Sequence, residues 1–185
     1  MLHILFGQGQ AKSVTSFGLA LRAVGRHRRV KVLQFMKGLQ AGEFLGAHML
    51  GPSISVELLG RHYPMKYPTN EEGMKQLYNE YFVNYRSPSN TDIKLVFKGL
   101  ERAKECFAEN KWDMVILDEI LTAWQFRMLK VDDILDMLKS RNCELVLTGS
   151  KAPKQLLHMA DYVTEFKYHK HPFEQGIAAR EAYDY

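Results

Sequence analysis

The chain has 185 residues, of which 46% are hydrophobic and 25% are charged, with a formal net charge of +4. This composition is typical of a globular domain with a full hydrophobic core, and it excludes an intrinsically disordered chain. We expect no membrane span and no secretory signal, because no apolar run approaches ~18 residues and the first residues lack a basic lead and a cleavage site.

Cysteine usage and charge clustering bear on location and partners. Cys106 and Cys143 stand alone, without a CxxC pair or clustered histidines, which favours a reducing, cytoplasmic setting over a disulfide or thiolate-zinc scaffold. Basic residues gather at positions 26–29 and at Lys31, which indicates either an anion-binding patch or a solvated loop. Because no RNA-binding aromatic motif or zinc-finger spacing accompanies this cluster, we expect no nucleic-acid partner.

Apolar periodicity alternates between strand and helix along the chain. In chain order it predicts a strand at 2–6, a helix at 13–24 capped by Ser13, strands at 30–35 and 54–59, a helix at 93–109, a strand at 113–118, a helix at 131–141, and strands at 143–148 and 162–166. This alternation indicates one α/β domain over 1–185, with a mainly parallel sheet covered by helices on both faces. The stretch from about 60 to 92, rich in Pro, Asn and Tyr, is interpreted as an irregular insertion.

The segment Gly7-Gln-Gly-Gln-Ala-Lys-Ser13 lies between the first expected strand and helix. Small residues let backbone N–H groups approach phosphate oxygens, while Lys12 can reach outer phosphates and the Ser13 hydroxyl can contact Mg²⁺. A Walker A loop has glycine immediately before its lysine, whereas Ala11 occupies that position here. A glycine-rich turn before a helix is also a common structural device, but the complete order of strand, loop, Lys-Ser and helix favours phosphate binding.

Two acidic residues, Asp118 and Glu119, end the apolar run at 114–117. They are expected at the carboxyl edge of the sheet, where open α/β folds bind ligands and where a carboxylate can hold Mg²⁺ directly or through water. Taken alone, the pair is equally typical of a charged helix start. Together with Lys12 and Ser13, it is interpreted as the equivalent of a Walker B motif.

Several further stretches carry distinctive patterns. They are Phe17-Gly-Leu-Ala-Leu-Arg-Ala-Val-Gly25, Gln34-Phe-Met-Lys-Gly38 followed by Gly42-Glu43, Val115-Ile-Leu-Asp-Glu119, Leu147-Thr-Gly149, Ala152-Pro153, Ala160-Asp-Tyr-Val-Thr-Glu165 and Lys170-His-Pro-Phe-Glu-Gln-Gly-Ile177. In this order, and with the glycine-rich loop, they resemble the ATP:corrinoid adenosyltransferases of the cobalamin-salvage type. That family has a RecA-like P-loop fold, which is therefore the expected fold here.

The resemblance implies transfer of the 5′-deoxyadenosyl group of ATP to the Co(I) of a corrinoid, which gives adenosylcobalamin and releases triphosphate. Because cobalt is itself a strong nucleophile, the protein needs no catalytic base; it must bind triphosphate and align C5′ with cobalt. The implied ATP-binding residues are those of the loop and the first helical turn, namely Gly7, Gln8, Gly9, Gln10, Ala11, Lys12, Ser13 and Val14.

The resemblance also implies particular roles and partners. Lys12 and Glu119 are the implied catalytic residues, and Ser13, Glu119 and Asp118 are the implied Mg²⁺ site. The implied assembly is a homodimer, and a reductase that supplies Co(I) is the implied partner.

The sequence departs from the family pattern within the loop and after the fifth expected strand. Gln10, Ala11 and Val14 replace a lysine, a glycine and a threonine, and Ser150 replaces an arginine for which Lys151 could substitute in part. A non-catalytic nucleotide- or corrinoid-binding relative with a degenerate P-loop is therefore the second hypothesis. A P-loop kinase or hydrolase is a third, for which no base is evident.

The family's aromatic segment, which helps to displace the lower axial ligand of the corrinoid, is missing from the middle of the chain. Tyr63 and Tyr67 lie in the corresponding region, and His171 and Phe173 lie in the tail, so these four residues are the expected corrinoid-pocket residues. The alternatives are that the tyrosines are surface-loop aromatics and that His171 is a packing residue.

Overall fold

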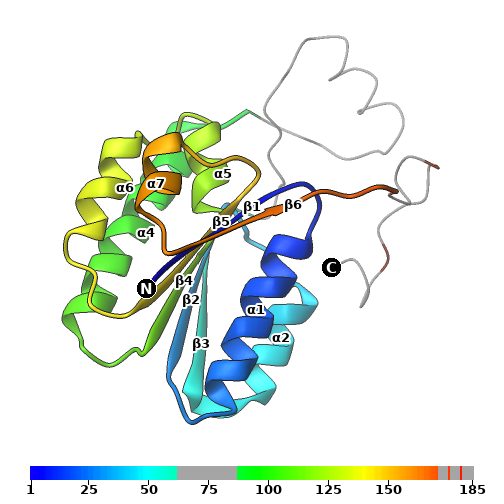
Figure 1. Ribbon diagram of the computed structural model, residues 1–185, viewed down its shortest axis with the longest axis vertical. Helices are drawn as coiled ribbons and strands as arrows, with labels where there is room; N and C mark the ends of the chain where they lie inside the picture. The colour runs from blue at the N-terminus through cyan, green and yellow to red at the C-terminus, as the bar shows by residue number, and fades with distance from the viewer. Residues whose placement is uncertain (62–86, 171–174, 176–179, 181–185) are drawn as a thin grey trace.

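Six strands form one parallel sheet with the order β3-β2-β4-β5-β1-β6 in the computed structural model, which describes residues 1–61, 87–170, 175 and 180 (Figure 1). The strands are β1 (Leu2–Gly7), β2 (Val30–Phe35), β3 (Ile54–Leu59), β4 (Met114–Asp118), β5 (Glu144–Gly149) and β6 (Tyr162–Phe166). All five neighbouring pairs run parallel, which confirms the expected α/β class and parallel sheet.

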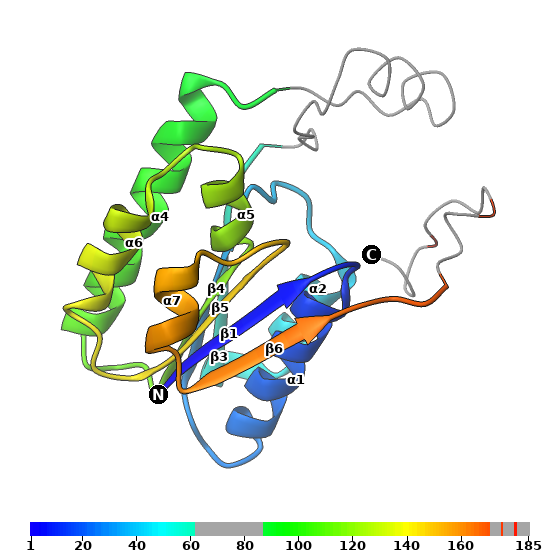
Figure 2. The same ribbon diagram turned by 45° about the horizontal axis from the view of Figure 1, so that its top comes forward.

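Helices cover both faces of this sheet, as the sequence predicts (Figure 2). One face carries α1 (Ala11–Val24) and α2 (Gly42–Met49), the latter followed by the short 3₁₀ helix η1 (Gly51–Ser53). The other face carries α4 (Asn90–Ala108), α5 (Ile120–Gln125), α6 (Val131–Leu138) and α7 (Lys154–Met159). The apolar side chains accordingly form two clusters, one on each face of the sheet.

The period-two alternation of the central strands assigns each side chain to one of these clusters. In β4, Val115 and Leu117 pack in the cluster under α4 to α7, whereas Ile116 packs in the cluster under α1 and α2. Asp118 has the same parity as Ile116, so its carboxylate emerges on the α1 face at the carboxyl end of the strand. The strand pattern therefore directs this acid toward the helix that follows the glycine-rich loop.

The structure differs from the sequence expectations at several element boundaries. Helix α1 begins at Ala11 with Gln10 as its N-cap, so Ser13 is not the cap but a buried residue of the first turn. Helix α4 begins at Asn90, inside the expected insertion, and Ser89 and Asp92 form a capping box there. Residues 62–86 of that insertion lie outside the described residues, so its irregular character and the extent of the single domain stay predictions.

Three short helices, α2, α5 and α7, were not predicted from the sequence. Two of them have six residues, and the third has eight with glycine at its first and fifth positions, so each is too short for a helical apolar periodicity to be recognised in the sequence. Among the described residues, no helix is both long enough and apolar enough to cross a membrane.

Candidate functional site

A cavity of about 740 Å³ opens at the carboxyl edge of the sheet, beside the glycine-rich loop. Its walls come from the loop, the segment after β2, and the ends of β4, β5 and β6. The lining residues are Gly7, Gln8, Gly9, Gln10, Lys12, Ser13, Val14, Lys37, Ala41, Glu43, Glu119, Ser150, Lys151 and Tyr168. Every expected ATP-binding residue except Ala11, whose side chain is exposed, therefore contributes to one cavity.

The entry to the loop depends on Gly7. This residue has φ 121°, and a Cβ placed on it would lie 2.2 Å from the carbonyl oxygen of Phe166 in β6. The same carbonyl accepts a hydrogen bond from the Gln8 N–H at 2.9 Å, so the loop begins where β1 and β6 are locked together. Gly9 also has a positive φ of 69°, which turns the chain toward α1.

Lys12 and Ser13 are buried in the first turn of α1. The Lys12 ammonium donates a hydrogen bond to the Gly9 carbonyl and so folds back over the loop. Backbone N–H groups of a first helical turn have no partner inside the helix, and they provide donors for an anion. The loop and the first turn of α1 thus place a cation and the backbone N–H groups of a helix start on the same wall of the cavity.

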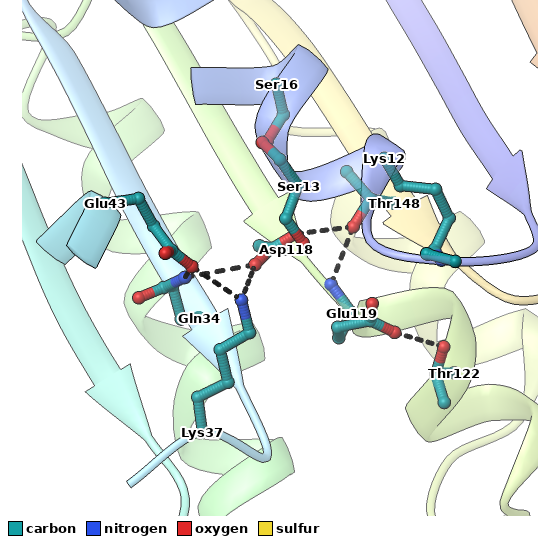
Figure 3. Close-up of polar contacts among 11 residues, drawn as sticks. Lys12, Ser13, Ser16, Gln34, Lys37, Glu43, Asp118, Glu119, Thr122 and Thr148 are labelled. Atoms are coloured by element: carbon teal, nitrogen blue, oxygen red, sulfur yellow. Dashed lines mark hydrogen bonds and ion pairs between the residues drawn. The ribbon is translucent and has the colours of Figure 1, made fainter. Parts of the chain in front are cut away.

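Asp118 is the centre of a buried hydrogen-bond network (Figure 3). Its Oδ1 accepts bonds from Ser13 Oγ at 2.9 Å and Thr148 Oγ1 at 2.7 Å. Its Oδ2 accepts bonds from Lys37 Nζ at 2.8 Å and Gln34 Nε2 at 3.1 Å. Because β4 lies between β2 and β5, one carboxylate collects donors from both neighbouring strands and from the first turn of α1.

A second carboxylate, Glu43 in the first turn of α2, joins the same network from the opposite side of Lys37. Glu43 Oε1 accepts bonds from Lys37 Nζ at 3.1 Å and from Gln34 Nε2 at 3.3 Å. The Lys37 ammonium thus bridges two carboxylates. Burial alone would lower the pKa of Lys37, but the Asp118 and Glu43 charges outweigh burial and raise it.

The two adjacent acids at the end of β4, Asp118 in the strand and Glu119 directly after it, have opposite electrostatic environments. Burial alone would raise the pKa of Asp118, but the Lys37 charge and the donated hydrogen bonds outweigh burial and lower it. The pKa of Glu119 is raised, first by burial and then by the negative charge of Asp118. The surroundings of Asp118 therefore stabilise its ionised form. The positive charge around Glu119 is too small to offset its burial and the negative charge of Asp118.

Glu119 turns toward the cavity because its backbone is left-handed, with φ 65°. Its N–H donates to Thr148 Oγ1 at 2.9 Å, and its Oε2 accepts a hydrogen bond from Thr122 Oγ1 in α5 (Figure 3). A positive φ is uncommon for a residue with a Cβ, and such conformations gather at functional sites.

The chemistry of these side chains fits a magnesium ion, with Ser13 and Glu119 nearest to it and Asp118 behind them, which is the division of roles that the family resemblance implies. Both Asp118 oxygens already accept hydrogen bonds from protein donors, so the geometry leaves this residue an indirect role toward a metal rather than a direct one. Ser13 gives its proton to Asp118, which leaves its oxygen lone pairs available to a cation. With Glu119 on the cavity wall, the protein offers two oxygen ligands, and Mg²⁺ commonly takes the rest from phosphates and water. Among the residues that the structure describes, no His, Cys, Asp and Glu cluster offers a complete protein-only site.

The structure brings together Lys12, Ser13, Asp118 and Glu119, as the sequence predicts. Tyr63, Tyr67, His171 and Phe173 lie outside the described residues, so their assignment to a corrinoid pocket stays a prediction. Sequence reasoning gave no role to five residues that the structure places in the network, namely Gln34, Lys37, Glu43, Thr122 and Thr148. Gln34 and Thr148 are the penultimate residues of parallel strands, and that position near the carboxyl edge of the sheet is the signal that could have identified them.

The chain is similar to known proteins over its whole length. The family model described as "ATP:corrinoid adenosyltransferase BtuR/CobO/CobP" matches residues 1–185. A Sinorhizobium protein named corrinoid adenosyltransferase is 30% identical over 185 residues, covering 97% of this chain and 77% of the relative. Proteins of the same name from Pseudomonas aeruginosa and Escherichia coli K12 are 28% and 27% identical, cover 100% of this chain, and are themselves covered over 83% and 85% of their lengths.

Proposed function

The chain belongs to the ATP:corrinoid adenosyltransferase family, and we propose that it transfers the 5′-deoxyadenosyl group of ATP to the Co(I) of a corrinoid. The cobalt electron pair forms the Co–C5′ bond, the C5′–O bond breaks, and its electron pair leaves with triphosphate. The observation that carries the proposal is the single cavity that combines the glycine-rich loop, Lys12, Ser13 and Glu119 in a chain of this family.

Lys12 and the backbone donors of the loop would hold the triphosphate. A cation and oriented N–H groups stabilise the negative charge that the leaving group gains as the C5′–O bond breaks. Gln8 and Gln10 line the same wall and offer neutral donors. The proposed reaction needs no general base, because the protein would have only to position the two substrates and stabilise the leaving group, and this arrangement supports that role.

Ser13 and Glu119 would hold Mg²⁺ against the phosphates, and Asp118 would keep the Ser13 hydroxyl in the required orientation. When bound, the ion neutralises phosphate charge and supplies the positive charge that the Glu119 carboxylate lacks in its buried position. A homodimer, a reductase that supplies Co(I) and a cytoplasmic location belong to the same proposal and rest on the family resemblance.

An anaerobic adenosylation assay tests the proposal. Chemically reduced cobalamin, ATP and Mg²⁺ are mixed with the protein, and a light-sensitive Co–C product is followed by its absorption spectrum while triphosphate is measured. We expect product from the unmodified chain and a rate at least about a hundredfold lower from Lys12→Ala, because one preorganised charged contact to the leaving group contributes ~2.7–4 kcal/mol. Lys139→Ala is the matched control, because Lys139 follows α6 at the opposite edge of the sheet and is exposed. No product above the Lys12→Ala background would refute the proposal.

A second candidate function is nucleotide binding without transfer. Gln10, Ala11 and Val14 favour it, because these departures from the family pattern fall on the loop itself. The adenosylation assay and a calorimetric ATP titration together separate the two functions. A protein that only binds nucleotide would show saturable ATP affinity in the titration and no Co–C product in the assay.

A further inference from the structure

Thr122 connects two walls of the cavity through one buried hydroxyl group. It lies in the first turn of α5, three residues after Glu119, and is 7% exposed. Its Oγ1 donates a hydrogen bond to Glu119 Oε2, accepts one from the Ser150 N–H at 2.9 Å and lies 3.3 Å from Ser150 Oγ. Ser150 belongs to the turn after β5, which forms another part of the cavity wall.

This hydroxyl has no capacity left for any further partner. A threonine hydroxyl offers one donor and two acceptor lone pairs. Here the proton goes to Glu119, while the two lone pairs face the N–H and the hydroxyl of Ser150. Gly149 packs directly against the backbone of Thr122, because a Cβ added to Gly149 would lie 2.5 Å from the backbone nitrogen of Thr122. The turn after β5 and the start of α5 are thus packed too closely for Thr122 to shift without moving Ser150.

The hydrogen bond from Thr122 determines which oxygen of Glu119 faces the cavity. A carboxylate attached through two methylene groups has several rotamers, and the left-handed backbone at Glu119 fixes only the direction of its Cα–Cβ bond. The bond from Thr122 holds Oε2 against α5, which leaves Oε1 as the oxygen available to the cavity. Because Thr122 is itself anchored to Ser150, this orientation is set relative to the wall that carries Ser150 and Lys151.

We propose that Thr122 is a positioning residue of this site, which orients the Glu119 carboxylate for the magnesium–triphosphate group by anchoring it to the Ser150 turn. The inference rests on the proposed function for its ligand, ATP with Mg²⁺. It differs from the roles of Lys12 and Ser13, because Thr122 does not line the cavity and acts through Glu119.

A double-mutant cycle tests this inference with calorimetric affinity for ATP in the presence of Mg²⁺ as the main measurement. Thr122→Val removes the hydroxyl at nearly constant volume, and Thr122→Ser keeps it. We expect Thr122→Val to weaken binding about tenfold or more, Thr122→Ser to stay within about threefold of the unmodified chain, and Thr122→Val to have less than a twofold effect when Glu119 is already Ala. Thr164→Val, an exposed position in β6, is the control for loss of a threonine hydroxyl and should leave the affinity unchanged.

The outcomes separate this inference from the proposed function. Equal losses from Thr122→Val with and without Glu119, or equal losses from Val and Ser, would overturn the positioning role. If Thr122→Val does not fold, Thr122→Ala adds no atom to the site and carries the same expectation. Failure to form a Co–C product while ATP with Mg²⁺ still binds would remove the proposed function and leave the positioning role standing. Failure of the unmodified chain to bind ATP would overturn both.

Discussion

Replacing Asp118 by Asn tests whether the buried network stabilises the fold as well as the site. All four polar partners of Asp118 act as donors, two on each oxygen. An amide NH₂ turned toward Lys37 and Gln34 would meet two N–H donors, and one turned toward Ser13 and Thr148 would require both hydroxyls to reverse and accept. In either orientation the Lys37 ammonium loses the negative charge of the closer of its two carboxylate partners. Removing one member of a buried ion pair costs about 3–5 kcal/mol.

The expected result is a large fall in melting temperature. In a chain of this length, ~1 kcal/mol corresponds to about 2–4 °C, so Asp118→Asn should melt about 6–20 °C below the unmodified chain at pH 7. The pKa of Asp118 is lowered by folding, so its contribution is present above the ordinary carboxyl pKa and is lost as pH falls through the lower, folded-state pKa. The difference in melting temperature between Asp118→Asn and the unmodified chain should therefore be constant from about pH 5 to 8 and should become smaller below about pH 4.

Glu119 provides the matched control, because folding shifts its pKa in the direction opposite to that of Asp118. The pKa of Glu119 is raised in the folded state, so the stability linked to it is complete below the ordinary carboxyl pKa and is lost as pH rises through the raised pKa. Glu119→Gln should therefore melt at or above the temperature of the unmodified chain at pH 7, although it is expected to impair function. Scanning calorimetry of the three proteins decides the matter. A melting temperature for Asp118→Asn within about 2 °C of the unmodified chain would refute the reasoning about the network.

Two further substitutions test the loop. Gly7→Ala should lower the free energy of unfolding by about 2–5 kcal/mol, because it combines an unfavourable positive φ with a Cβ placed 2.2 Å from the Phe166 carbonyl oxygen, whereas Gly18→Ala in α1 meets no atom within 4 Å and should stabilise by about 0.5–1 kcal/mol. Chemical denaturation measures both, and equal effects would contradict the role of the close contact at Gly7. Ala11→Gly should leave calorimetric ATP affinity within about twofold, because the Ala11 side chain is exposed and does not line the cavity. A tenfold gain in affinity would show that the alanine obstructs the ligand.

The sequence predicted the pairing of the glycine-rich loop with Asp118 and Glu119 because both follow buried strands, and parallel strands bring their carboxyl ends to one edge. It could not predict how Asp118 is used. The strand order places β4 between β2 and β5, and only that order brings Gln34 and Thr148 to opposite sides of the carboxylate. Strand order depends on long-range packing, which local periodicity does not contain.

The error at Ser13 has the same origin. Its position after the glycine-rich loop resembles an N-cap, but the helix begins two residues earlier and the Ser13 hydroxyl bonds a residue 105 positions away in the chain. A tertiary partner therefore outweighs the local preference of serine for helix starts. Thr122 was not predicted for a related reason, since its helix is only six residues long and its partners lie directly after β4 and after β5.

The three departures from the family pattern in and next to the loop are all at exposed positions. Gln10, Ala11 and Val14 are all exposed, whereas Lys12 and Ser13, which match the pattern, are buried. Buried residues hold the loop, α1 and β4 together, while exposed ones meet the ligand or solvent. The substitutions at positions 10, 11 and 14 therefore leave the framework of the site intact, and those at positions 10 and 14 change the surface that lines the cavity, whereas Ala11 does not line it. Any difference in activity between this chain and its relatives that arises from these positions should appear as a change in ATP affinity, with little change in stability.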